Sequence, residues 1–384
     1  MATKKYLVVG TGKMGLAVAY DLLLNPDTAG VTVCDRDGAA LAAAASVLHD
    51  PRVSGVMADA GDLDRMHRLM VGHDCAIGAA SYDFNLSLTK AAIASRIHFC
   101  DLGGNNGVVE KQFMLDAAAK NAGIRVLPDC GIAPGAVSVL ARHALDMVPA
   151  AERLQIRVGG LPQKPEGLLK YALAFSVRGL VNEYVEPAEI LWEGKRELVP
   201  SLGGLEYQEF PEPFGRLEAA YTSGGSSTLA RTYEGRVKYL DYKTLRWPGH
   251  WDVIRTMRGL GMFDETSRID VGSICTPREF TERFLEKTLP KGVPDALVLR
   301  VAATDRERKG VVFDLIDLAD PATGHSAMQR TTAYSASICA RMLAYGIIAD
   351  VGTLRHEVSI QPALFLDEWK KRGIDLLIRP AQPA

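Results

Sequence analysis

Short apolar runs alternate with longer stretches of helical periodicity from Tyr6 to about Asp146. The runs are bounded by Gly, Asp or Pro and predict strands, whereas the Ala- and Leu-rich stretches between them predict helices. The predicted strands are Tyr6–Val9, Val31–Asp35, Gly55–Asp59, Cys75–Ala79, His98–Asp101 and Arg125–Leu127. The predicted helices are Met14–Leu24, Ala39–His49, Leu63–Met70, Phe84–Ala94 and Lys111–Asn121. This alternation predicts a doubly wound α/β fold, with a parallel sheet covered by helices on both faces.

The pattern changes after Pro149. Longer β-leaning runs such as Leu154–Val158 follow, with more aromatic residues and Pro/Gly turns, and they predict a mixed α/β domain. The runs Ala296–Ala302 and Val311–Leu318 are joined by a charged turn and predict a hairpin. The small and apolar residues of Thr331–Tyr345 predict a buried helix that returns the chain to the first domain.

A chain of 384 residues exceeds what one hydrophobic core usually serves, so two domains are expected. We place the first domain at residues 1–148 and the inserted domain at 149–330, with 331–384 returning to the first. A helix that opens at Ala133-Pro134-Gly135 and runs to about Met147 ends the first domain, because proline presets φ in a first helical turn.

Composition and charge narrow the class of partner. Apolar residues make up 47% and charged residues 23%, as in ordinary globular proteins. A net charge of -2 offers no field for nucleic acid or an anionic membrane, so we expect a small-molecule partner. The N-terminus lacks the form of a signal peptide and no window approaches the ~20 apolar residues of a membrane span, which predicts a cytoplasmic protein.

The cysteines occur singly, without C-x-x-C spacing. This spacing signals neither a zinc site nor a disulfide framework, so no metal site is predicted. We interpret all of them as reduced core residues, because an unpaired cysteine behaves as a small hydrophobic side chain. The six are Cys34, Cys75, Cys100, Cys130, Cys275 and Cys339.

A glycine-rich turn follows the first predicted strand directly and opens the first predicted helix. In this context G-x-G-x-x-G predicts a Rossmann dinucleotide-binding fold, and with it an NAD(P)-dependent oxidoreductase. The first glycine permits the tight turn, the second admits the pyrophosphate, and the third brings helix and strand together. The turn consists of Gly10, Thr11, Gly12, Lys13, Met14 and Gly15.

Acidic residues end the second and third predicted strands. Asp35 stands 20 residues beyond the last glycine of the turn, where a carboxylate accepts hydrogen bonds from the adenosine ribose hydroxyls. A 2′-phosphate there would meet a like charge, which favours NAD over NADP, although Arg36 follows and can pair with a phosphate. Asp59-Ala60 is expected near the adenine edge, or else Asp59 caps the helix that starts near Asp62.

Ligands of doubly wound sheets lie at the carboxyl ends of the strands. At these ends, the small residues Ala79 and Ala80 leave room for the nicotinamide ribose. Asp101 and Asp129 are the carboxylates expected to face the reacting carbon, unless they cap loop backbone instead.

Several motifs together resemble the saccharopine dehydrogenase superfamily, and within it the lysine 6-dehydrogenases most. They are Gly10–Gly15, Asp59–Asp62, Asp101–Gly104, Pro128–Gly135, Thr222–Gly225 and Tyr242–His250. The resemblance implies a Rossmann domain completed by the C-terminal part, and an inserted domain that binds substrate and forms a homodimer or higher homo-oligomer. It also implies NAD-dependent oxidation of the ε-amine of L-lysine to the 6-semialdehyde, which cyclises to piperideine carboxylate, with release of ammonia. Other members act on saccharopine or on carboxynorspermidine.

Amine oxidation by hydride transfer requires loss of an ammonium proton, so a base must stand near the substrate nitrogen. Asp101, Asp129 and His250 are the candidates, and the sequence does not choose among them. Arg246 offers a planar fork for the substrate carboxylate, and Tyr171 is a candidate pocket wall.

Other substrate contacts are expected before a helix at Leu229. The hydroxyl and N–H groups of Thr222, Ser223 and Gly224 form an anion pocket there, or else they cap the helix. Strand alternation places Tyr242, Thr244 and Arg246 on one face and Lys243 on the other.

A protein of a different class also fits these patterns, namely an NAD-binding sensor or assembly protein that has lost the chemistry. Tight NAD binding without oxidation of any amine would indicate it. The substrate, the direction of the reaction and the choice between NAD and NADP stay open at this point.

Overall fold

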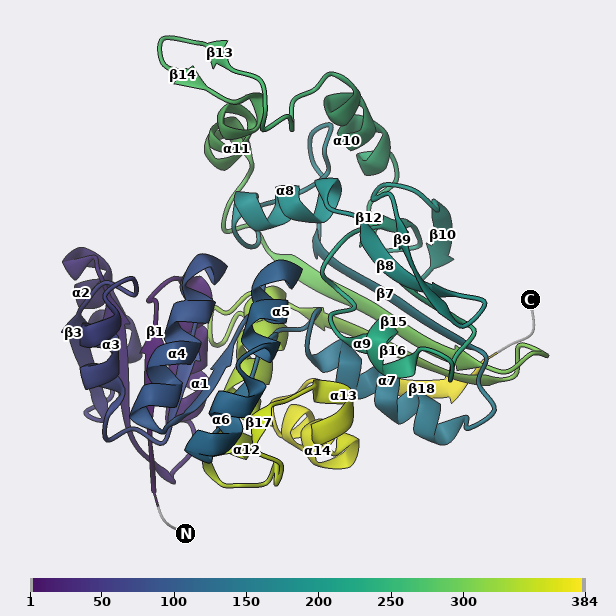
Figure 1. The fold of residues 1–384 in the computed structure, drawn as a ribbon. Coiled ribbons are helices and arrows are strands. Elements are labelled where there is room, and N and C mark those ends of the chain that lie inside the picture. The colour runs from purple at the N-terminus through teal and green to yellow at the C-terminus, as the bar shows by residue number, and fades with distance from the viewer. Residues whose placement is uncertain (1–2, 382–384) are drawn as a thin grey trace. The chain divides into compact units, whose positions relative to one another are not determined.

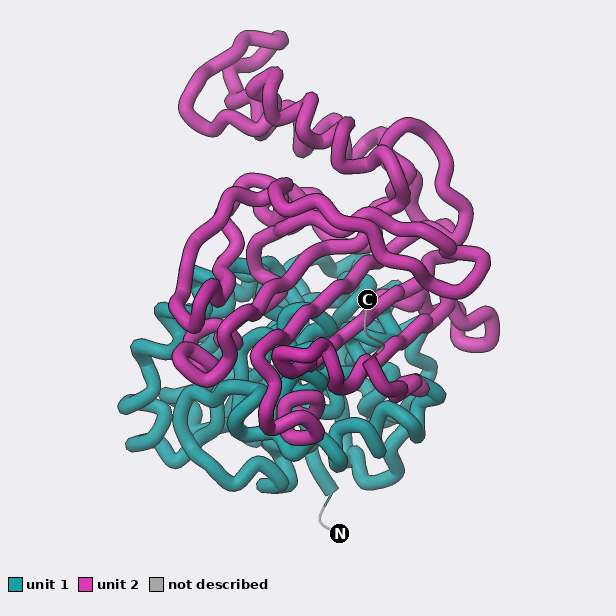
Figure 2. Tube along the Cα trace, turned by 90° about the vertical axis from the view of Figure 1, so that its right-hand side faces the viewer, with its two compact units in different colours: residues 1–142, 329–374 teal, residues 143–328, 375–384 magenta. Residues whose placement is uncertain are grey.

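The computed structural model describes residues 3–381 (Figure 1). The described chain forms two compact units, shown in different colours in Figure 2. The first unit contains the residues up to Arg142 together with Gln329–Ile374, and the second contains His143–Met328 together with the residues from Asp375 on. The chain passes from the first unit to the second within helix α7 (Ala136–Met147).

The first unit is built on a seven-stranded parallel sheet with the order β17-β6-β5-β4-β1-β2-β3. Its strands are β1 (Lys4–Val9), β2 (Thr28–Asp35), β3 (Val53–Met57), β4 (Cys75–Gly78), β5 (His98–Asp101), β6 (Arg125–Leu127) and β17 (Gly352–Thr353). The predicted bounds of β5 and β6 are confirmed. The edge strand β3 begins and ends two residues before the prediction, because its half-exposed residues give a weaker apolar pattern.

Helices pack on this sheet in two groups, α1 with α2 and α12, and α3 with α4, which also contacts α5 and α6. The helices are α1 (Lys13–Leu23), α2 (Gly38–Leu48), α3 (Leu63–Met70), α4 (Asn85–Ser95), α5 (Asn106–Phe113), α6 (Asp116–Ala122), α12 (Tyr334–Ala344), α13 (His356–Ser359) and α14 (Pro362–Lys371). Short helical turns η1 (Tyr82–Phe84) and η2 (Gln329–Ala333) precede α4 and α12. The predicted doubly wound sheet is therefore confirmed, with the expected helix at Lys111–Asn121 divided between α5 and α6.

The loop after β6 differs from the prediction that a helix opens at Pro134. The helix α7 begins only at Ala136, and Gly135 before it has a φ of +125°. A Cβ at Gly135 would lie 2.3 Å from the Gly131 carbonyl oxygen. The loop is folded tightly on itself, so Pro134 lies in a turn and not in the first helical turn.

The segment after residue 328 returns to the first unit, as far as Ile374. Buried Asp21 of α1 accepts hydrogen bonds at 2.8 Å from Nε and Nη2 of Arg372, and it also binds Ser337 of α12. The last strand, β18 (Leu377–Pro380), instead pairs with β16 in the sheet of the second unit. The expectation that all of residues 331–384 belong with the first domain is thus not met beyond Ile374, because the open edge of β16 takes up the strand.

The second unit is built on a mixed sheet with the central order β10-β11-β12-β7-β15-β16-β18, and with β8 pairing to both β12 and β9. Its other strands are β7 (Arg153–Pro162), β8 (Ala188–Trp192), β9 (Lys195–Val199), β10 (Glu206–Glu209), β11 (Arg216–Tyr221), β12 (Tyr239–Arg246), β15 (Asp295–Thr304) and β16 (Gly310–Leu318). Strands β15 and β16 pair antiparallel from Ala296 with Leu318 to Thr304 with Gly310, which confirms the predicted hairpin.

Helices of the second unit are α8 (Val177–Val185), α9 (Leu229–Tyr233), α10 (His250–Gly259) and α11 (Pro277–Thr288). A buried cluster joins α8, α10 and α11 around Trp251 and Tyr184. A small pair of strands, β13 (Ile269–Asp270) and β14 (Ile274–Cys275), precedes α11 and projects from the unit (Figure 1).

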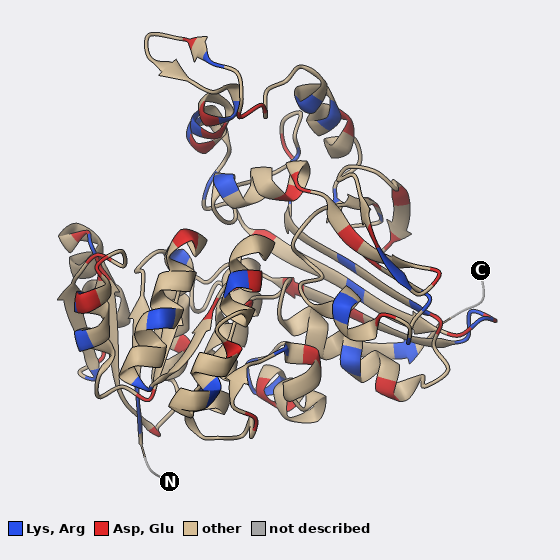
Figure 3. Ribbon diagram, viewed as in Figure 1, with Lys and Arg blue, Asp and Glu red and all other residues tan. Residues whose placement is uncertain are grey.

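Acidic and basic residues are interspersed along both units, which agrees with the net charge of -2 (Figure 3). None of the helices among the described residues is long and apolar enough to cross a membrane.

Candidate cofactor and substrate sites

The glycine-rich turn lies where the strand order of the first sheet reverses, between β1 and β4. Gly10 has a φ of +107°, and a Cβ there would lie 2.8 Å from the backbone of Ala79 and Ala80. A Cβ at Gly15 would lie 1.9 Å from the Gly10 carbonyl oxygen. Both glycines are therefore required by close backbone packing, and Ala79 and Ala80 border the turn.

Gly12 has a different environment. A Cβ at this position would have no atom within 4 Å, so open space lies in front of it. Gly12 also precedes α1, where no side chain caps the first turn. Lys13, which is exposed, and Met14, which is half-buried, open the helix. Free N–H groups at a helix start with open space before them fit a diphosphate.

Asp35 lies at the end of β2 and faces this turn. Its Oδ2 accepts hydrogen bonds at 2.8 Å from both N and Oγ1 of Thr11, and its Oδ1 accepts one at 3.1 Å from N of Asp37. Partial burial would raise the pKa of Asp35, but these hydrogen bonds outweigh it and lower the pKa. An ionised carboxylate is thus held beside the turn, and Arg36 next to it is exposed.

Asp59 accepts a hydrogen bond at 2.8 Å from N of Gly61, and Asp62 accepts one at 2.9 Å from N of Arg65. The helix cap of α3 is therefore Asp62 and not Asp59. Asp59 is exposed and Ala60 is buried at the end of β3, so the side chain of Asp59 is left facing solvent.

Asp101 is fully buried at the end of β5. Its Oδ1 accepts from N of Gly103 at 2.8 Å and from N of Asp129 at 3.3 Å, and its Oδ2 accepts from Nε2 of Gln112 at 2.7 Å. Burial and the nearby Asp129 carboxylate raise the pKa of Asp101 to about 7 against these hydrogen bonds. These contacts support the capping interpretation, in which Asp101 shapes the two loops.

Asp129 lies in the loop after β6, where this loop meets the loop after β5. It is buried and has a φ of +65°, a left-handed conformation that is uncommon outside glycine. A Cβ at Gly103 would lie 2.0 Å from Oδ1 of Asp129, so only glycine fits beside this carboxylate. The loop after β5 and the loop after β6 are thereby fitted to one another around Asp129.

In the second unit, Arg246 is the last residue of β12, and its charged side chain is buried. Its guanidinium lies 4.9 Å from the ring centroid of Tyr171, and its Nη2 lies 3.4 Å from the Tyr184 hydroxyl. Among the described residues, Nε of Arg246 has no hydrogen-bond partner. Buried polar atoms are normally hydrogen-bonded, so this guanidinium has unused capacity to bind a ligand.

Glu183 of α8 is the charged residue that lies beside Arg246. Its Oε2 lies 3.7 Å from Nη2 of Arg246, and its side chain is 27% exposed. Burial raises the pKa of Glu183 to about 7, although the charge of Arg246 opposes the rise. Only the fold brings α8 to the end of β12, so the sequence carried no signal for this pairing.

His250 has both ring nitrogens occupied. Its Nδ1 lies 2.7 Å from the Leu169 carbonyl oxygen and its Nε2 lies 3.0 Å from the Tyr184 hydroxyl. Burial and the charge of Arg246 lower the pKa of His250 to about 3. A neutral ring donates from Nδ1 to the carbonyl and accepts at Nε2 from Tyr184. These contacts support a role in positioning Tyr184 rather than in shuttling protons.

The expected anion pocket at Thr222–Gly224 is not supported by the contacts. Oγ1 of Thr222 lies 2.6 Å from Oγ1 of Thr244, and Oγ of Ser223 binds the Asn182 carbonyl oxygen at 3.2 Å. The helix that follows has only five residues, and Gly224 is a positive-φ position in the loop before it. The hydroxyls hold the fold together, since they contact neighbouring strands and α8.

The alternation predicted for β12 is confirmed. Thr244 lies 3.5 Å from the Tyr242 hydroxyl on one face, whereas Nζ of Lys243 lies 2.6 Å from the Gly204 carbonyl oxygen and 2.5 Å from Oε2 of Glu206 on the other. Lys243 is therefore paired with Glu206.

The parallel sheet and the open turn at Gly12 define the first unit as an NAD(P)-binding domain of the Rossmann type. A family model described as saccharopine dehydrogenase NADP binding domain matches residues 6–127, and one described as saccharopine dehydrogenase C-terminal domain matches residues 131–374. The chain belongs to the saccharopine dehydrogenase family.

Two curated relatives are similar in sequence. The chain is 25% identical over 297 residues to the L-glutamate-forming saccharopine dehydrogenase [NADP(+)] of Pyricularia oryzae, which covers 74% of this chain and 64% of the relative. It is 24% identical over 274 residues to the mitochondrial alpha-aminoadipic semialdehyde synthase of Bos taurus, covering 68% of this chain and 28% of the relative. The chain thus aligns with less than two thirds of either relative. The broader family resemblance is confirmed, while the finer likeness to lysine 6-dehydrogenases stays a prediction.

Two solved structures share the fold. The apo saccharopine dehydrogenase (L-Glu forming) of Saccharomyces cerevisiae matches with a TM-score of 0.80 at 19% identity, covering 99% of this chain and 100% of the other. The homospermidine synthase of Legionella pneumophila in complex with NAD matches with a TM-score of 0.72 at 13% identity, covering 99% and 92%. At these identities the likeness is evidence for the fold alone.

Proposed function

We propose that the protein is an NAD(P)-dependent oxidoreductase that acts on the carbon–nitrogen bond of a carboxylated amine. The observation that carries this proposal is the buried Arg246, with Nε unpartnered among the described residues and Glu183 beside it. A guanidinium binds a carboxylate through two charge-assisted hydrogen bonds. Membership of the saccharopine dehydrogenase family supports the reaction class.

The first unit holds the dinucleotide in this proposal, and a bound nicotinamide supplies the hydride acceptor. Gly12 and the uncapped start of α1 bind the diphosphate, while Asp35 binds the adenosine ribose. The ionised Asp35 repels a 2′-phosphate, which favours NAD, and the exposed Arg36 is the residue that would moderate this preference.

Within the second unit we assign Arg246 to the substrate carboxylate and Glu183 to the substrate nitrogen. A carboxyl group with a pKa of about 7 accepts a proton near neutral pH, as removal of an ammonium proton requires. Asp101 and His250 are weaker candidates for this base because their polar atoms already have partners. Asp129 remains the alternative base.

Saccharopine is the first substrate to test, since the sequence relative from Pyricularia oryzae is named for it. L-Lysine is the second, because it carries a single carboxylate for Arg246 and offers an amine to Glu183. Saccharopine carries more carboxylates and would need further cations.

The test is to assay the purified chain with saccharopine, L-lysine and carboxynorspermidine, each with NAD and with NADP, while following the reduced cofactor. Ammonia release distinguishes lysine oxidation from cleavage of a secondary amine. Asp35→Ala should raise the KM for NAD far more than the KM for the amine. Tight NAD binding without turnover of any amine would instead indicate a cofactor-binding sensor, and light scattering on the same samples would test the expected homodimer.

A further inference from the structure

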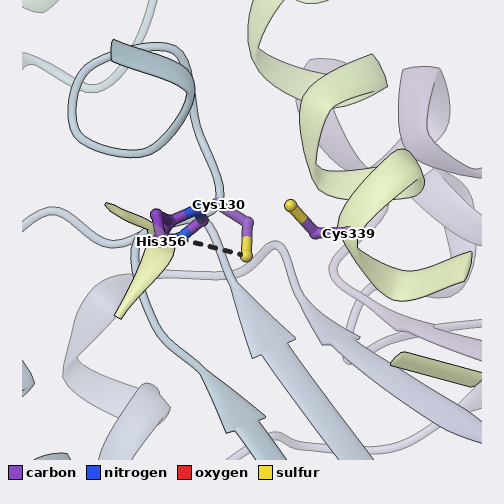
Figure 4. Close-up of side chains that lie close together, drawn as sticks. All are labelled: Cys130, Cys339 and His356. Carbon is purple, nitrogen blue, oxygen red and sulfur yellow. Dashed lines mark hydrogen bonds between the residues drawn. The ribbon is translucent and has the colours of Figure 1, made fainter. Parts of the chain in front are cut away.

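Three potential metal ligands meet in the core of the first unit, and none of them is assigned above to cofactor or substrate. Cys130 lies in the loop after β6, Cys339 in α12 and His356 at the start of α13. One ligand atom from each lies within 4.8 Å of the others. Figure 4 shows the Cys339 sulfur directed toward Cys130, with the His356 ring beside Cys130. We call these three residues the Cys-Cys-His cluster.

The cluster is closed to solvent and has a nitrogen without a partner. The exposed fractions are 0% for Cys130, 1% for Cys339 and 4% for His356. Nε2 of His356 lies 2.9 Å from the Pro128 carbonyl oxygen and 3.7 Å from Sγ of Cys130. Nδ1 of the same ring has no hydrogen-bond partner among the described residues. An imidazole that donates one N–H to a backbone carbonyl keeps a lone pair on its other nitrogen, as histidine ligands of metals commonly do.

The sulfur and nitrogen ligand atoms of the Cys-Cys-His cluster favour soft metal cations. Two thiolates and one imidazole suit Zn²⁺ and Cu⁺, whereas Mg²⁺ and Ca²⁺ take oxygen ligands. Metal–donor bonds of about 2.0–2.3 Å place neighbouring donors roughly 3.5–3.8 Å apart, so the cluster needs only small side-chain movements to close around an ion. Two thiolates also cancel the charge of Zn²⁺, which removes the main cost of placing an ion in an apolar core.

We propose that the Cys-Cys-His cluster binds one thiophilic d¹⁰ cation, which fastens the loop after β6 to α12 and α13. Binding releases two protons, one from each thiol, and involves no change of oxidation state. The ion is structural, because no substrate position is open in so closed a site. The proposal does not depend on the proposed oxidoreductase activity.

Cu⁺ and Zn²⁺, the two candidate ions, differ in the number of ligands that they require. Within the described part of the chain, no fourth His, Cys, Asp or Glu has a ligand atom within 4.8 Å of all three, although the buried Cys100 thiol contacts that of Cys130. Cu⁺ is satisfied by three soft donors, whereas structural Zn²⁺ is almost always four-coordinate and would need a backbone carbonyl or water as well.

The experiment is to produce the full chain in medium supplemented with zinc or with copper, purify it under nitrogen with a phosphine reductant, and measure bound metal by mass spectrometry. One equivalent of one of these ions is expected. Cys339→Ser and His356→Gln should each lower the affinity by more than about 100-fold, since the loss of outer partners alone costs ~10–100-fold. Cys275→Ser removes a buried thiol of the second unit and should leave the metal content unchanged.

Co²⁺ exchanged into the wild-type chain gives a readout that does not require a variant to fold. A thiolate-to-cobalt charge-transfer band that saturates at one equivalent supports the site. No bound metal and no such band would overturn the proposal, as would equal metal content in wild type and the correctly folded Cys339→Ser variant. A Cys130–Cys339 disulfide found by peptide mapping under the same reducing conditions would also overturn it.

Discussion

The Tyr184 hydroxyl and Nε2 of His250 lie 3.0 Å apart, and the direction of that hydrogen bond assigns His250 its role. Because Nδ1 of His250 is committed to the Leu169 carbonyl oxygen, Nε2 accepts and Tyr184 donates. The Tyr184 oxygen is then free to accept from Nη2 of Arg246 at 3.4 Å. A neutral histidine thus orients a tyrosine that in turn contacts Arg246, the arginine that we propose binds the substrate carboxylate.

His250→Asn should raise the KM for the carboxylated substrate while leaving the shape of the pH–rate profile between pH 6 and 8 unchanged. The reason is that a group with a pKa of about 3 does not titrate in that window. Initial rates across pH for variant and wild type check this. Loss of one limb of the pH–rate profile in the variant would indicate that His250 transfers a proton.

Gly12→Ala and Gly15→Ala should separate ligand binding from folding. A Cβ at Gly12 meets no atom within 4 Å, so the Tm should hold while NAD affinity falls at least about 10-fold as the methyl group enters the diphosphate site. A Cβ at Gly15 would lie 1.9 Å from the Gly10 carbonyl oxygen, so that variant should lose stability itself. Calorimetry with and without NAD measures both effects, and unchanged affinity in Gly12→Ala would argue against the assigned turn.

Arg246→Lys should weaken binding of a carboxylated substrate by about 10- to 100-fold, because lysine lacks the bidentate fork and charged hydrogen bonds contribute about 1.5–3 kcal/mol. The KM for NAD should stay the same. The matched control is the substrate amide, which lacks the charge, so wild type and variant should handle it alike. A similar loss with the amide would show that Arg246 acts on the fold and not on the carboxylate.

Glu183→Gln should remove the acidic limb of kcat/KM. In the wild type the carboxyl group has a pKa raised by burial to about 7, so the rate of a base-dependent step should fall as pH drops below that value. The glutamine variant should be slow at every pH and show no inflection near 7. If the limb persists in Glu183→Gln, Asp129 becomes the base to test.

Asp101 should make the protein less stable as pH rises from about 4 to 7. Its pKa is raised to about 7 in the folded chain from the ordinary aspartate value of 3.8, so the folded state binds the extra proton in that window. The contribution of Asp101 to the free energy of unfolding is complete below the pKa of the unfolded chain. It is lost as the pH rises to the pKa of the folded chain, with a slope of at most about 1.4 kcal/mol per pH unit.

Asp101→Asn should flatten the dependence of stability on pH. Oε1 of Gln112 has no partner among the described residues, so this amide can turn to accept from the new asparagine. Urea unfolding at pH 5 and pH 8 compares the two proteins. Equal slopes would indicate that Asp101 does not bind the extra proton.

The sequence by itself determined the first unit in detail. Buried parallel strands are almost wholly apolar and short, and glycines at close backbone contacts admit no substitute, so β5, β6 and the turn at Gly10–Gly15 could be located from local pattern alone. The alternation along β12 was also readable, because side chains of a strand point to opposite faces in turn.

Only the tertiary structure decided which side chains meet. Glu183 and Arg246 lie in different elements 63 residues apart, and Cys130 lies more than 200 residues from Cys339 and His356. The same is true of the hydrogen bonds by which Asp101, His250 and Thr222 contact neighbouring loops, helices and strands. Local pattern reports how a residue packs within its own element, whereas the partners of a polar group depend on how distant elements fold together.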